Sequence, residues 1–96
     1  MGGKIMDRLI GKEVSGYKIE GWKCLDKDSV LVWCESQTDC EGDEYRMEVE
    51  YWNDEDSWVF TRVYEHVIMP HGLTGYDRAE FISVIAPVIE EAKLFN

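Results

Sequence analysis

Apolar and polar residues alternate most regularly along residues 44–52, a pattern that predicts a β-strand because neighbouring side chains of a strand point to opposite faces. One face of this strand carries Tyr45, Met47, Val49 and Tyr51, and the other carries Glu44, Arg46, Glu48, Glu50 and Trp52. The polar residues 53–56 predict a hairpin loop, and residues 57–65 return as the next strand. With Trp52 opposite Ser57, the apolar sides of both strands form one aromatic inner face.

Two further strands are predicted earlier in the chain. Residues 16–25 alternate until Gly21, where the phase slips by one position, which is typical of a β-bulge. After a turn at residues 26–29, residues 30–35 are almost entirely apolar. A strand of this kind is expected at the centre of a sheet and covered on both faces.

Helical spacing appears at both ends of the chain. Residues 4–10 predict a short helix, and a longer one begins at Thr74 or Asp77 after an irregular segment at residues 66–76. The apolar stripe of this second helix is Phe81, Ile85, Val88, Ala92 and Phe95. Pro87 lies within the stripe and should kink or split the helix, because proline removes a backbone donor.

These elements predict one domain of the α+β class over residues 1–96, since 96 residues are enough for one hydrophobic core and too few for two. The expected architecture is a four-stranded antiparallel β-meander with a short N-terminal helix. The longer, Pro-kinked C-terminal helix should pack on one face of the sheet, with its stripe against the aromatic side.

The net charge of −10 narrows the classes of partner. Direct binding to nucleic acid is disfavoured, because affinity for phosphates comes from clustered Lys and Arg. Binding to an anionic membrane is disfavoured for the same reason. A basic protein surface is the partner that this charge favours.

The negative charge is unevenly distributed along the chain. Residues 35–56 contain ten of the 20 acidic residues and one of the ten basic residues, so that this segment carries −9 and the rest of the chain −1. We therefore expect a partner-binding surface whose members are Glu44, Glu48, Glu50, Trp52, Asp54, Glu55 and Asp56. The competing interpretation is that acids on exposed strands and hairpin tips serve only solubility and protect sheet edges.

The sequence offers little for catalysis. The two histidines, His66 and His71, are five residues apart across a proline, and the three cysteines match no zinc pattern. No phosphate-binding or nucleophile motif is present. We expect no enzymatic activity, no catalytic residue, no metal and no cofactor. Three free thiols, no visible signal peptide and no long apolar run predict a cytoplasmic protein that spans no membrane.

In size, acidity and layout the chain resembles phage-encoded inhibitors, including DNA mimics that block restriction, repair or CRISPR enzymes. The likeness is one of general character, so it assigns no residue. It implies a non-enzymatic inhibitor that occupies a basic nucleic-acid site, such as an anti-CRISPR or anti-restriction protein. The alternatives are a structural or accessory subunit that forms homo-oligomers such as a homodimer, and a small-ligand site between helix and sheet near Trp22, Trp33 and Trp58.

Overall fold

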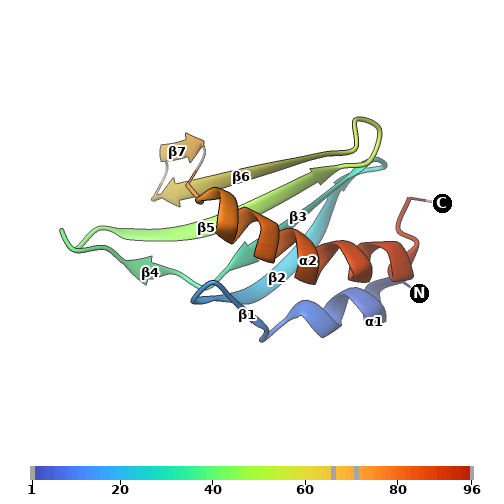
Figure 1. The fold of residues 1–96 in the computed structure, drawn as a ribbon, viewed down its shortest axis with the longest axis horizontal. Coiled ribbons are helices and arrows are strands. Elements are labelled where there is room, and N and C mark those ends of the chain that lie inside the picture. Colours follow the sequence, from blue (N-terminus) through green and yellow to red (C-terminus); the bar gives the residue numbers. More distant parts are fainter. Residues whose placement is uncertain (1, 66, 71, 96) are drawn as a thin grey trace.

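The computed structural model describes residues 2–65, 67–70 and 72–95 as two helices and a curled antiparallel sheet (Figure 1). Along the chain the elements are α1 (Gly2–Met6), the 3₁₀ turn η1 (Asp7–Leu9), β1 (Glu13–Val14), β2 (Tyr17–Asp26), β3 (Ser29–Cys34), β4 (Gln37–Thr38), β5 (Glu44–Trp52), β6 (Ser57–Tyr64), β7 (Val67–Pro70) and α2 (Gly75–Ala92). The strand order is β1-β2-β3-β5-β6-β7, and β4 pairs separately with β5. The α+β class is confirmed.

The prediction of four strands is wrong, because the sheet has seven. The four predicted strands are present as β2, β3, β5 and β6, and the three missed strands have two to four residues each. Strands of this length cannot show alternation and form only where a longer neighbour supplies the hydrogen-bonding partners. With these additional strands the sheet is wider than predicted, and it curls as a half-barrel around the helices (Figure 1).

The predicted bulge in the first long strand is confirmed. Ile19 pairs with Cys34 and Gly21 with Trp33, which leaves Glu20 as the extra residue of β2. A Cβ atom added to Gly21 would lie 2.5 Å from Cζ2 of Trp33. Glycine is therefore needed here for close approach of the indole ring.

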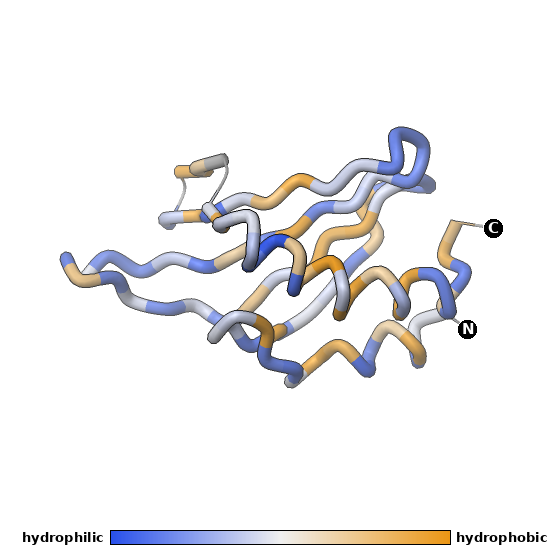
Figure 2. The backbone as a smooth tube through the Cα atoms, viewed as in Figure 1, coloured by the Kyte–Doolittle hydropathy of each residue, from blue (hydrophilic) through white to orange (hydrophobic). Residues whose placement is uncertain are grey.

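The predicted register of the central hairpin is confirmed in every pair. Trp52 lies opposite Ser57, and the two strands remain in phase from there to the far end. Tyr51 and Trp58, which face each other, have ring centroids 4.6 Å apart. Figure 2 shows that the loop joining β5 and β6 is uniformly hydrophilic.

Both helices pack on the aromatic side of the sheet (Figure 1), and for α2 this placement was predicted. Four of the five predicted stripe residues lie in α2 and are buried, and Phe95, beyond the end of α2, is partly buried against the same cluster. The Thr74 side chain caps α2 by accepting a hydrogen bond from the backbone N–H of Asp77. The helix continues through Pro87 without being split.

The prediction that the strand at residues 30–35 is covered on both faces is wrong. Val30, Val32 and Cys34 of β3 are buried under the helices, but Leu31 and Trp33 point the other way and are only partly buried. No described helix lies over that second face of the sheet. An apolar strand in this protein therefore contributes side chains to a solvent-facing surface.

Candidate functional site

The sheet surface opposite the helices is covered by no described helix, and we call it the outer face. It is defined by Leu31, Trp33, Glu48, Glu50, Trp52 and Val59, which alternate with buried residues of β3, β5 and β6. Strand pairing brings them into adjacent rows, because Glu48 lies opposite Trp33, and Glu50 lies between Leu31 and Val59. The outer face therefore combines aromatic, aliphatic and acidic side chains.

A connected set of side chains holds Trp33 in place. Its indole N–H donates to Oε1 of Glu20 at 3.1 Å, and the guanidinium of Arg46 lies 6.0 Å from its ring centroid. Arg46 in turn forms an ion pair with Glu48, with Nη2 and Oε2 2.6 Å apart. Because both its edge and its ring face are engaged, Trp33 offers a fixed aromatic surface to a partner.

Glu48 is therefore less available to a partner than the sequence suggested. Its side chain is 15% exposed and its charge is balanced by Arg46. Glu50, two residues further along β5, makes no ion pair among the described residues. It stands between two apolar neighbours, so its carboxylate is the free negative charge at the centre of the outer face.

The β5–β6 hairpin forms one acidic end of the molecule. Asp54 and Glu55 are exposed there, while Asp56 accepts a hydrogen bond from the Tyr51 hydroxyl at 2.9 Å on the helix side. The backbone N–H of Asn53 donates to the carbonyl of Asp28 in the β2–β3 turn. This contact places the β2–β3 turn, with Asp26 and Asp28, beside the hairpin tip. The two turns are far apart in the sequence, so a count of charges along the chain does not reveal that they meet.

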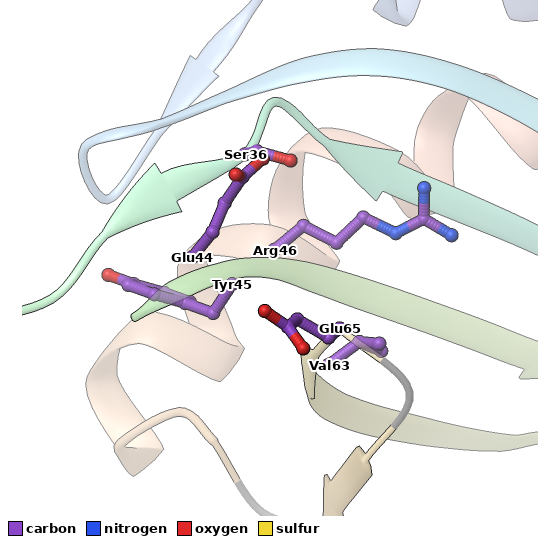
Figure 3. A pocket seen from close by; sticks show the side chains of 6 residues that line it. All are labelled: Ser36, Glu44, Tyr45, Arg46, Val63 and Glu65. Carbon is purple, nitrogen blue, oxygen red and sulfur yellow. The ribbon is translucent and has the colours of Figure 1, made fainter. Parts of the chain in front are cut away.

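The opposite end of the sheet is also acidic. Glu44 borders a hollow of about 440 Å³ together with Ser36, Tyr45, Arg46, Val63 and Glu65 (Figure 3). Glu65 has a left-handed backbone conformation, with φ of 48°, directly after β6. Glu65, which lies outside the 35–56 segment, thus borders the same hollow as Glu44.

The predicted site residues fall into two groups. Glu44, Glu48, Glu50 and Trp52 share one side of β5, whereas Asp54, Glu55 and Asp56 occupy its far tip. Sequence reasoning missed Trp33, which it placed with Trp22 and Trp58 near the helices. Alternation with the buried residues of β3 is the signal that would have assigned Trp33 to the outer face.

The three cysteines have different environments. Cys34 is buried, and burial together with the smaller effect of the nearby Glu20 carboxylate raises the pKa of its thiol to about 12. Cys24 and Cys40 are exposed. Cys34 is therefore unsuited to act as a nucleophile, because its reactive thiolate is suppressed.

Neither a metal-binding cluster nor a membrane-spanning helix is present among the described residues. No group of three His, Cys, Asp or Glu side chains there is arranged to hold a metal ion. His66 and His71 lie outside the described residues. Neither described helix combines the length and apolar character required to cross a bilayer.

Comparison with known proteins identified no matching family model, curated protein or solved structure.

Proposed function

We propose that the protein is a non-enzymatic binding domain whose outer face engages a basic surface of another protein. The observation that carries the proposal is the free carboxylate of Glu50 among Leu31, Val59 and Trp52, on a sheet face that no described helix covers. Aromatic and aliphatic side chains supply buried contact area at such interfaces, and the surrounding charges select the partner and accelerate association.

The curvature of the sheet favours a partner whose binding surface is concave. The sheet curls around its helices, so the outer face is convex (Figure 1). Its two ends are acidic, with Asp54 and Glu55 at one and Glu44 and Glu65 at the other. A convex surface with this charge complements a basic groove, and we include in the proposal an inhibitor that mimics nucleic acid and occupies such a groove.

Partner capture at two salt concentrations tests the proposal. Immobilised protein is incubated with host lysate at 50 and 500 mM NaCl, and the affinity of each captured protein is then measured with purified components. We expect Glu50→Lys and Trp52→Ala each to weaken binding at least tenfold, because the first introduces a repulsive charge and the second removes an apolar anchor.

Glu90→Lys is the matched control, since it makes the same charge change at an exposed position of α2, on the helix side of the molecule. It should alter the affinity less than threefold. Equal effects of Glu50→Lys and Glu90→Lys would show that overall charge, rather than the outer face, determines binding. A salt-resistant homodimer that buries Trp52 would instead favour a structural homo-oligomeric subunit.

A further inference from the structure

The free edge of the sheet at β7 carries three consecutive exposed apolar side chains. Val67, Ile68 and Met69 are 59%, 66% and 51% exposed. β7 ends the strand order, so only β6 pairs with it among the described strands. Natural sheets protect such an edge with charges, proline or a short strand; β7 is short and ends in Pro70, but it contains no charge.

The backbone of Ile68 faces this free edge. Pairs in an antiparallel ladder alternate between hydrogen-bonded and non-hydrogen-bonded. Pro70, which has no N–H, pairs with Thr61, so that pair is of the non-hydrogen-bonded kind. Two residues earlier, the pair of Ile68 with Val63 is of the same kind. The N–H and C=O of Ile68 therefore point outward, where another strand can bind them.

The two sides of β7 have different surroundings. Ile68 lies on the outer side beside Val63. Val67 and Met69 line a hollow of about 700 Å³ on the other side. The same hollow is bordered by one basic residue, Arg62, and by five acidic residues that outnumber it, Asp39, Glu41, Asp43, Glu44 and Glu65. A strand added at this edge would thus meet apolar groups on one side and carboxylates on the other.

We propose that the β7 edge binds an extended segment of another protein in which basic and apolar residues alternate. The backbone of that segment pairs with Ile68, in the manner of strand addition. Its apolar side chains pack beside Ile68 and Val63, and its Lys or Arg stems lie along Val67 and Met69 with their charges among the carboxylates. The inference concerns a different surface from the outer face and stands independently of it.

Charge argues against a second copy of the same chain at this edge. β7 contains no Lys or Arg to offer to the acidic hollow. Each chain carries a net charge of −10, so two copies repel each other. A segment that contains Lys or Arg supplies positive charge to the acidic hollow and is attracted, not repelled, by the negatively charged chain.

The probe for this site is the heptapeptide acetyl-Val-Lys-Val-Lys-Val-Lys-Val-amide, and its glutamate counterpart is the negative control. Calorimetric titration of the wild type should show binding of the lysine peptide alone. Ile68→Pro should weaken it at least tenfold, because proline removes the outward N–H and leaves the bonds between β6 and β7 intact. Ile68→Ala keeps the N–H and should cost less than threefold. Circular dichroism confirms that each variant is folded.

Charge and location are tested separately. Glu41→Gln with Asp43→Asn should weaken peptide binding at least fivefold, whereas Trp52→Ala on the outer face should leave it unchanged. In ¹⁵N spectra the largest shifts should appear at Ile68 and Met69. Equal binding to Ile68→Pro and the wild type would overturn the inference, as would shifts centred on the outer face. A dimer that Ile68→Pro dissociates would replace it with self-association.

Discussion

At the scale of single residues, the structure separates thiols that look alike in the sequence. Cys34 is 1% exposed on the helix-facing side of β3, while Cys24 and Cys40 are exposed. Burial disfavours the charged thiolate and raises the pKa of Cys34 to about 12, against an ordinary value of 9.0. Two consequences follow, one for chemical reactivity and one for stability at alkaline pH.

We predict that iodoacetamide at pH 8 modifies two of the three thiols in the folded protein and all three in urea, as counted by mass spectrometry.

Above about pH 9 the unfolded chain releases the Cys34 proton and the folded chain keeps it. Stability therefore falls as pH rises toward 12, by at most about 1.4 kcal/mol per pH unit for this group.

Cys34→Ala should flatten that decline, and Cys24→Ala should not. Urea unfolding at pH 8, 9 and 10 measures the difference between their slopes. Rapid modification of Cys34 in the native protein would contradict the buried position on which the argument rests.

At the scale of elements, the bulge in β2 affects both the stability of the fold and the position of Trp33 on the outer face. Gly21 lies against the indole of Trp33, whose other edge and face are held by Glu20 and Arg46. Space at this one position therefore determines where a surface tryptophan sits.

Gly21→Ala should destabilise the protein by about 1–3 kcal/mol, because the new Cβ must displace a ring that is already packed. Gly3→Ala is the matched control. Gly3 lies in α1, and its added Cβ would meet Trp22 at an ordinary 3.8 Å. Alanine favours helices, so this variant should gain roughly 0.5–1 kcal/mol. Urea unfolding compares the two variants, and a Gly21→Ala protein that is at least as stable as Gly3→Ala would contradict the close approach.

The elements also show which parts of the fold could be predicted from the sequence. The pairing of β5 with β6 was predicted residue by residue, because nine alternating positions and a short polar loop allow one register. β7 was not predicted, because Val67, Ile68 and Met69 form a short apolar run without alternation. β1 has only two residues, Glu13 and Val14, and exists through its pairing with β2.

The candidate site was predicted in part for similar reasons. Alternation placed Glu48 and Glu50 on the same side of β5, and the structure agrees. It also placed Arg46 there, two residues before Glu48, so the ion pair that balances Glu48 was foreseeable. The position of Glu65 at the same hollow as Glu44 was not foreseeable, since it depends on strand pairing between distant segments.

At the scale of the whole molecule, like charges dominate. The chain has 20 acidic and ten basic residues, and the described residues form two ion pairs, Arg8 with Glu91 and Arg46 with Glu48. Most carboxylates are thus uncompensated by close contacts. Their mutual repulsion opposes the compact state at neutral pH.

Raising NaCl from 20 to 300 mM at pH 7 should therefore stabilise the protein, because salt screens this repulsion. A gain on the order of 1 kcal/mol corresponds to a rise in Tm of about 4–8 °C for a chain of this size. Scanning calorimetry measures it. The same step at pH 4.5, near the pI of about 4.5, should leave Tm nearly unchanged. A Tm that falls with salt at pH 7 would show that attractive pairs outweigh repulsion.

The contact between the first and second helices has a consequence for biosynthesis. A Cβ added to Gly2 would lie 2.7 Å from the carbonyl oxygen of Ala92, so α1 rests against the last turn of α2. While the ribosome is still making the sheet, Val32, Val49 and Phe60 lack the side chains of α2 that complete their core. The core closes only once α2 has left the exit tunnel, and a nascent chain paused before that point is an exposed, aggregation-prone intermediate.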